Sequence, residues 1–227
     1  MTRFIEPVTL TGTHATLLPL AREHVDALAK AAEDGELWRL WYTSVARPER
    51  MQEYVDGALD MRERHDAMPF VVRDNAGGDI VGCTRMCNVD ARNRRLEIGY
   101  TWYARRVQRT ALNTECKLLL LGHAFDVLRC IAVEFRTHWF NFASRAAIAR
   151  LGAKQDGVLR NHQVMPDGSR RDTVVFSIVD GEWPAVRAHL RPFGRVVVEK
   201  HERVEADVER RRDRLQVARL VRPVRLK

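Results

Sequence analysis

Cysteine and long apolar runs are both scarce in this 227-residue sequence. Its four cysteines form no CxxC pair, and each lies in or beside an apolar stretch, so we expect neither a disulfide framework nor a metal site. The N-terminal residues include no apolar signal core, and the longest leucine run, Leu118 to Leu121, is far too short to cross a bilayer. We therefore expect a cytoplasmic protein that does not act at a membrane.

Net positive charge is also small outside the C-terminal tail, although the formal net charge of the whole chain is +8. Residues 191–227 contain 12 Lys+Arg and 6 Asp+Glu, which leaves 26 and 24 in residues 1–190. A nearly neutral body does not favour a domain that follows a phosphate backbone. Because the length suits one domain and 45% of the residues are apolar, we predict a globular domain over 1–190. The basic, charged tail over 191–227 is expected to be a projecting helix or disordered.

The order of periodic segments predicts an α+β fold. Alternating apolar residues favour a strand or hairpin in 8–20, three antiparallel strands in 68–104, a strand in 130–139 and a hairpin in 158–180. Residues repeating at helical spacing predict helices in 21–40, 49–67, 113–128 and 142–153. Asn113 is the expected cap of the third helix, and Gly152 is expected to end the fourth.

Two short signatures lie on these elements. The turn Gln108-Arg109-Thr110-Ala111-Leu112-Asn113 joins a strand to a helix, where free backbone N–H groups and the helix dipole can bind an anion. Further along, Asn141, Ser144, Arg145, Leu151 and Gly152 form the pattern N-x-x-S-R-x(5)-L-G. Together with the element order, these signatures resemble the GNAT acetyltransferase superfamily, in particular its ribosomal-protein alanine N-acetyltransferase branch. The resemblance covers residues 8–190 and is most specific over 96–153.

The resemblance implies a mixed, mostly antiparallel twisted sheet of about seven strands flanked by about four helices. It also implies acetyl-CoA as co-substrate. The expected acetyl-CoA-binding residues come from one strand, the loop after it and the helix of the second signature: Tyr100, Trp102, Tyr103, Gln108, Arg109, Thr110, Ala111, Leu112, Asn113, Thr114, Asn141, Ser144 and Arg145. The chain departs from the family pattern at Ala111 and Asn113, where glycine-type residues are usual, and at Ile148, where many members have a tyrosine.

Two side chains are implied as catalytic. Glu97 lies between apolar neighbours on a strand, and the resemblance makes it the general base that deprotonates the incoming amine through water. Ser144 would protonate the departing thiolate, because Ile148 cannot. The alternatives are a solvated Glu97 paired with Arg94 or Arg136, and a helix capped by Asn141 with Ser144 merely in its first turn.

Several aromatic and polar residues are candidates for binding the acceptor. His138, at the end of a strand, could orient the acceptor or move a proton, and it could equally be structural. Trp38, Trp41 and Tyr42 could wall the acceptor pocket or form a small satellite core. Asn161 and His162, on the penultimate strand, could likewise bind the acceptor or have only a structural role.

The function expected from these residues is acetyl transfer from acetyl-CoA to a primary amine by direct attack in a ternary complex. The acceptor would be a peptide or protein N-terminus, or a small amine. Two alternatives stay open: a non-catalytic acyl-CoA-binding regulatory module, and a ribosome- or RNA-associated protein acting through its basic tail. A homodimer is left open as well.

Overall fold

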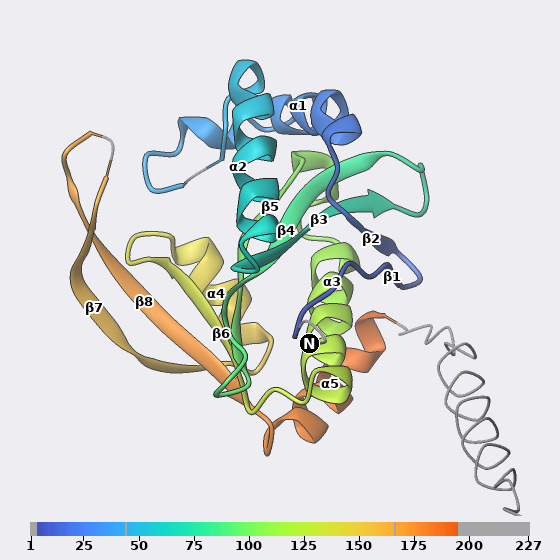
Figure 1. Ribbon diagram of the computed structural model, residues 1–227, viewed down its shortest axis with the longest axis vertical. Coiled ribbons are helices and arrows are strands. Elements are labelled where there is room, and N and C mark those ends of the chain that lie inside the picture. The colour runs from blue at the N-terminus through green and yellow to red at the C-terminus, as the bar shows by residue number, and fades with distance from the viewer. Residues whose placement is uncertain (1–3, 44, 166, 195–227) are drawn as a thin grey trace, which may run out of the picture. The chain divides into compact units, whose positions relative to one another are not determined.

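The computed structural model describes residues 4–43, 45–165 and 167–194 (Figure 1). In this part of the chain eight strands form one sheet, in the order β1-β2-β3-β4-β5-β6-β8-β7, with five α-helices packed around it. The strands are β1 (Leu10–Thr11), β2 (Ala15–Pro19), β3 (Ala67–Asp74), β4 (Ile80–Asp90), β5 (Arg95–Tyr103), β6 (Ala132–His138), β7 (Lys154–Val164) and β8 (Arg170–Val179). The helices are α1 (Val25–Glu33), α2 (Met51–Glu63), α3 (Ala111–Gly122), α4 (Phe142–Arg150) and α5 (Trp183–Leu190). The expected α+β fold is confirmed, with one strand and one helix more than expected.

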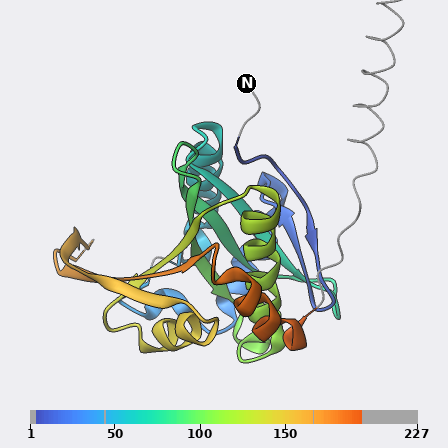
Figure 2. The same ribbon diagram turned by 90° about the horizontal axis from the view of Figure 1, so that it is seen from below.

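In the described sheet one pair of neighbouring strands, β5 and β6, is parallel, and every other pair is antiparallel. Strands β1 to β5 pair antiparallel in chain order, whereas β5 and β6 pair parallel over only three positions, from Arg95 with Ala132 to Glu97 with Glu134. Beyond Glu97 the two strands separate. On the far side of β6, strands β8 and β7 form a hairpin that projects past the rest of the sheet (Figures 1 and 2).

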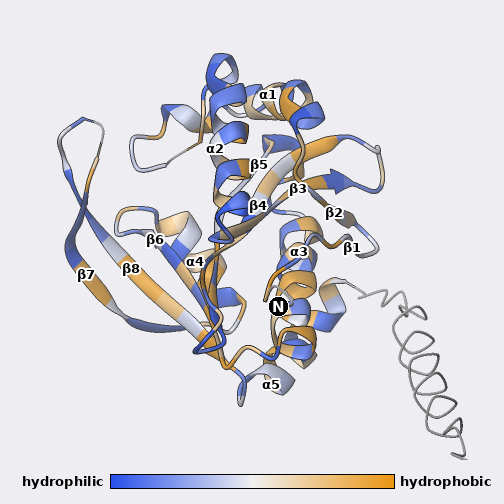
Figure 3. Ribbon diagram, in the orientation of Figure 1, coloured by the Kyte–Doolittle hydropathy of each residue, from blue (hydrophilic) through white to orange (hydrophobic). Residues whose placement is uncertain are grey.

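Helices cover both faces of the sheet. Two adjacent residues of β4 identify the faces: Thr84 accepts a hydrogen bond from Lys117 of α3, and Arg85 stacks on Tyr54 of α2. Because successive side chains of a strand point to opposite faces, α2 and α3 lie on opposite sides of the sheet. Hydrophobic colour is concentrated on the central strands and α3 (Figure 3), and the run Leu118 to Leu121 is fully buried.

The start of α3 corrects one prediction. The helix begins at Ala111, and its cap is Thr110, whose hydroxyl accepts from the N–H of Leu112 at 3.3 Å. Asn113 therefore lies in the first turn and is not the cap. Thr110 has extended backbone angles, as a capping residue needs, so the helix starts earlier than the apolar pattern suggests.

Two other helix boundaries differ from the sequence expectation. α1 ends at Glu33, shortly before Gly35 turns the chain with a φ of +107°, and a short 3₁₀ turn over Leu37–Arg39 follows. Helix α5 was not expected, because its eight residues show only a brief apolar pattern. Gly152 follows α4 with a φ of +96°, as predicted for the residue that ends it.

In the described residues, no helix is long and apolar enough to cross a membrane. The tail expected over 191–227 lies, from residue 195 onward, outside the described residues. The boundary near residue 190 therefore stays a prediction.

Candidate active site

A bulge in β5 shapes the site. Cys83 of β4 pairs with Trp102 and Arg85 pairs with Gly99, so β5 contains one more residue than the strand opposite it. Tyr100 takes up the extra length with a φ of +52°, which a non-glycine residue adopts only when its surroundings hold it there. Its ring lies 4.2 Å from the guanidinium of the buried Arg85. The bulge lies beside the point where β5 and β6 separate.

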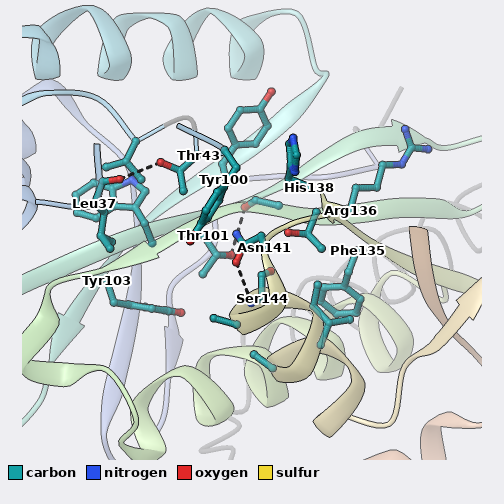
Figure 4. Close-up of a pocket in the computed structure, with 18 of the residues that line it drawn as sticks. Leu37, Thr43, Tyr100, Thr101, Tyr103, Phe135, Arg136, His138, Asn141 and Ser144 are labelled. Carbon is teal, nitrogen blue, oxygen red and sulfur yellow. Dashed lines mark hydrogen bonds between the residues drawn. The ribbon is translucent and has the colours of Figure 1, made fainter. Parts of the chain in front are cut away.

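A cavity of about 400 Å³ occupies this separation (Figure 4). Its walls are the ends of β5 and β6, the inner faces of α3 and α4, residues from 37–43 together with Val45, and one residue each of α2 and β8. Nine of the predicted site residues line it: Tyr42, Tyr100, Trp102, Tyr103, Gln108, Asn113, His138, Asn141 and Ser144. The two signatures, far apart in the sequence, thus meet at one cavity.

The loop before α3 tolerates its non-glycine residues. The positive φ, +61°, is at Arg109, whereas Ala111 is the first residue of the helix and has no such strain. Gln108 fixes the loop by donating from Nε2 to the carbonyl oxygen of Tyr103 at 2.8 Å. Because the first N–H groups of a helix have no partner inside the helix, the start of α3 can hold the pyrophosphate of CoA.

An unpaired acceptor points to the same ligand. Oδ1 of Asn113 is buried at the cavity and has no hydrogen-bond partner in the described part of the protein. Buried polar atoms are nearly always paired, so this oxygen calls for a ligand N–H group. The pantetheine arm of acetyl-CoA carries amide N–H groups of that kind, and the residues present fit this co-substrate.

Some residues of the second signature line the cavity, and others point away from it. Oδ1 of Asn141 accepts from the N–H of Ser144 at 3.0 Å, so Asn141 caps α4 and places Ser144 on the cavity wall. Arg145 is directed away, with its guanidinium 4.3 Å from the Trp139 ring. Other predicted loop residues are also engaged elsewhere: Thr114 accepts from Arg150 of α4, and Leu112 is buried.

Glu97 is a buried carboxylate that does not itself line the cavity but lies directly behind two residues that do, Gly99 and Arg136. Its side chain accepts from Nδ2 of Asn88 at 2.7 Å and lies 3.5 Å from Nε of Arg136. The expected pairing with Arg136 is therefore present, but the carboxylate is buried and not solvated. A methyl group on Gly99, which lines the cavity, would come within 2.8 Å of Oε1 of Glu97. Burial raises the pKa of Glu97 above its ordinary value, against the lowering influence of Asn88 and Arg136. A carboxylate with a raised pKa is a stronger base than an exposed glutamate, as a general base needs to be.

His138 lies on the other side of β6 from Phe135, which faces the helices (Figure 4). Nδ1 of His138 accepts from the N–H of Phe140 at 3.0 Å, so the neutral ring carries its proton on Nε2. That Nε2 is buried without a partner among the described residues. Burial, and then the charge of Arg171, lower the pKa of His138, which favours a neutral donor over a base.

The remaining acceptor candidates separate into two groups. The Trp41 ring stacks edge-on to His138 at 4.8 Å, and Tyr42 lines the cavity. Trp38 packs instead against the main core, in line with a structural role. Asn161 and His162 are exposed on β7, where they bond to Asp172 and Thr173, and the structure does not bring them to the cavity.

Sequence reasoning did not select three cationic residues of the wall as site residues: Lys117, Arg171 and Arg136, which was considered only as a partner of Glu97. Lys117 is 5% exposed and donates to Oγ1 of Thr101 at 2.6 Å. A signal for it was available, because a lysine just before four leucines in a helix that is apolar all round must be buried. The two arginines carried no such signal, since they lie on strands whose pairing only the fold reveals.

Comparisons with known proteins agree with this geometry. The family model described as "Acetyltransferase (GNAT) domain" matches residues 14–154. The Bacillus subtilis (strain 168) protein named "Putative ribosomal N-acetyltransferase YdaF" is 30% identical over 106 residues, which are 47% of this chain and 57% of that protein. This chain therefore matches little more than half the length of that curated relative.

Solved structures resemble the fold over most of its length. A GCN5-related N-acetyltransferase from Brucella melitensis is 30% identical with a TM-score of 0.74, covering 83% of this chain and 86% of that one. RimJ of Mycobacterium smegmatis, solved with CoA-disulfide, is 21% identical with a TM-score of 0.68, and the match covers 81% of this chain and 93% of RimJ. At this level of identity the likeness supports the fold alone. Cavity, loop and family match agree: the chain belongs to the GNAT acetyltransferase family, whose members take the acetyl group from acetyl-CoA.

Proposed function

We propose that this protein is an N-acetyltransferase that moves the acetyl group of acetyl-CoA directly to a primary amine in a ternary complex. The observation that carries the proposal is the buried Glu97 carboxylate beside the cavity that opens between β5 and β6. A base and an acyl-donor site placed together are what direct transfer requires. A regulatory module that only binds acyl-CoA would have no need of a buried carboxylate there.

Each part of the wall has a role in this proposal. The start of α3 holds the pyrophosphate, and Gln108 and Asn113 orient the pantetheine arm. Backbone N–H groups at the bulge, over Tyr100 to Trp102, donate to the thioester carbonyl and stabilise the charge that develops on its oxygen. Glu97 accepts the proton of the incoming ammonium through a water molecule, and Ser144 donates a hydrogen bond to the sulfur.

The acceptor side is formed by aromatic rings and His138. Tyr42, on the cavity wall, excludes water from the amine, Trp41 packs edge-on against His138, and Nε2–H of His138 donates to an oxygen next to the amine. A peptide N-terminus carries a carbonyl oxygen at that position. We infer an N-terminal amine of a ribosomal protein as acceptor; the name of the Bacillus subtilis relative and the basic C-terminal tail support this inference.

Calorimetric titration with acetyl-CoA, followed by a thiol-release assay with N-terminal peptides and small amines, tests the proposal. We expect micromolar binding, CoA release with peptide acceptors, and an acetylated α-amine by mass spectrometry. Binding with no release on the whole panel would instead support the regulatory module. Absence of acetyl-CoA binding would contradict the proposed function altogether.

A further inference from the structure

Lys117 carries a buried charge that the roles assigned above do not use. Its side chain, on α3, is 5% exposed, and in the described part of the chain no carboxylate oxygen lies within 4.0 Å of Nζ. Burying an ammonium without a counter-ion is costly, so a fold normally avoids it. An unbalanced lysine inside an acyl-donor cavity is therefore a candidate for function.

Neutral hydroxyl groups hold the ammonium in place. Nζ donates to Oγ1 of Thr101 at 2.6 Å and to Oγ1 of Thr84 at 3.4 Å, and these two hydroxyls lie 2.7 Å apart. An ammonium has three N–H donors, so two are used and no partner is described for the third. Because hydroxyl groups do not neutralise charge, the positive charge remains available to an anion in the cavity that Lys117 lines.

The other titratable groups around Lys117 do not supply that anion. The groups acting on it are the thiols of Cys116 on α3 and of Cys83 and Cys87 on β4. Burial raises the pKa of Cys83 to about 11 and that of Cys116 to about 12, and it raises the pKa of Cys87 as well. All three are neutral thiols near pH 7. Burial also lowers the pKa of Lys117 itself to about 8, close to that of an ordinary thiol.

The ammonium lies where an anion forms during transfer. Thr101, its nearest partner, follows Tyr100 at the bulge, whose N–H groups are assigned to the thioester carbonyl. Lys117 is also four residues along α3 from Asn113, so both side chains lie on the cavity face of one helix. When the bond from the acetyl carbon to sulfur breaks, the electron pair leaves with the sulfur as a thiolate.

We propose that the ammonium of Lys117 is the counter-ion of the departing CoA thiolate and the donor of the proton that neutralises it. This inference rests on the proposed function. The acceptor nitrogen bonds to the acetyl carbon as the C–S bond breaks, Nζ gives a proton to the sulfur, and neutral Lys117 regains a proton released by the acceptor nitrogen through solvent. Ser144 contributes a neutral hydrogen bond from α4, since a hydroxyl is a poor proton source.

The test compares bound CoA in wild type, Lys117→Met and Lys117→Arg. The readout is the ultraviolet absorbance of the thiolate during a pH titration, as the difference between complexes with CoA and with desulfo-CoA. We expect the pKa of the bound thiol to be about one unit or more lower in wild type than in Lys117→Met. Lys117→Arg keeps the charge and should keep the lowered thiol pKa, but its guanidinium cannot give up the proton, so kcat should fall at least about tenfold.

Lys154→Met, on an exposed lysine of β7, is the matched control and should leave the thiol pKa and kcat unchanged. An unchanged thiol pKa in a folded, CoA-binding Lys117→Met, in a wild type that turns over, would overturn the inference and leave the proposed function intact. If Lys117→Met does not fold, Lys117→Arg decides alone: full kcat with the arginine would exclude the proton transfer. Failure of wild type to transfer acetyl groups would contradict the proposed function instead.

Discussion

At the residue scale, opposing influences set the behaviour of Glu97. Burial favours the protonated carboxyl and raises its pKa, whereas the hydrogen bond from Asn88 and the charge of Arg136 favour the carboxylate. The balance leaves a carboxyl whose pKa lies above that of an exposed glutamate, which makes it the stronger base of the two. Arg136 is shared with Glu134, at 2.9 Å, which limits how strongly it holds Glu97.

We expect Glu97→Gln to lower kcat by about 10²- to 10⁴-fold, since the amide cannot accept the proton of the amine. In wild type kcat/KM should rise with pH as the carboxyl ionises, with a midpoint above the ordinary 4.5 of a glutamate. The pH profile of thiol release measures both effects. Persistence of the same acidic limb in Glu97→Gln would assign it to another group.

Asn88→Gly tests whether the acidic limb of the pH profile belongs to Glu97, because it should move the pKa of Glu97 in a known direction. Asn88 has a φ of +48°, which glycine adopts without strain, so the variant removes the hydrogen bond with little effect on the backbone. Loss of this donor should raise the pKa of Glu97 further and move the acidic limb of kcat/KM to higher pH. An unmoved limb would show that Glu97 is not the group that titrates.

At the scale of elements, α3 connects the site to the far edge of the sheet. The carboxylate of the fully buried Glu115 accepts from the N–H groups of Thr13 and His14, in the turn between β1 and β2, and of Ala15, the first residue of β2. Two residues later, Lys117 faces the cavity. The hydrogen bonds of the Glu115 carboxylate thus anchor α3, the helix that carries Lys117, to the segment between β1 and β2.

We expect Glu115→Ala to lower the free energy of unfolding by about 3 kcal/mol, because buried N–H groups lose a charged acceptor. Glu115→Gln, which keeps one acceptor oxygen, should cost less. Urea unfolding followed by circular dichroism measures both, with the exposed Glu63→Ala on α2 as control. Equal stability of Glu115→Ala and wild type would remove this cluster from the anchoring of α3.

The elements also mark the limit of sequence reasoning. Apolar alternation and helical spacing predicted β3 to β5 and α2 to α4 well, because local patterns determine which side of an element is buried. The sequence could not reveal the bulge at Tyr100, whose positive φ is held by neighbouring strands, nor the capping of α3 by Thr110. Glu97 and Ser144 could be selected in advance, and Arg136 could be named only as a partner of Glu97. Arg171 reaches the cavity wall because β8 lies beside β6, which only the fold reveals.

At the scale of the whole molecule, the proposed chemistry and most of the excess charge lie in different parts of the sequence. The cavity is lined by residues between Leu37 and Arg171. Residues 195–227 contain 11 Lys+Arg against 6 Asp+Glu, in a chain with a formal charge of +8. A basic segment of this kind increases affinity for polyanions without contributing to catalysis.

Truncation after Gly194 should therefore separate RNA binding from acetyl transfer. The full chain should bind single-stranded RNA with an affinity that falls steeply with salt, by about 0.7 in log K per log salt for each phosphate neutralised, and the truncated chain should lose most of it. Acetyl-CoA affinity and kcat with a short peptide should change less than about twofold, because no residue of the cavity wall is removed. Unchanged, salt-sensitive RNA binding after truncation would place the RNA contact on residues 1–194. Loss of acetyl-CoA binding would show that the tail takes part in the site.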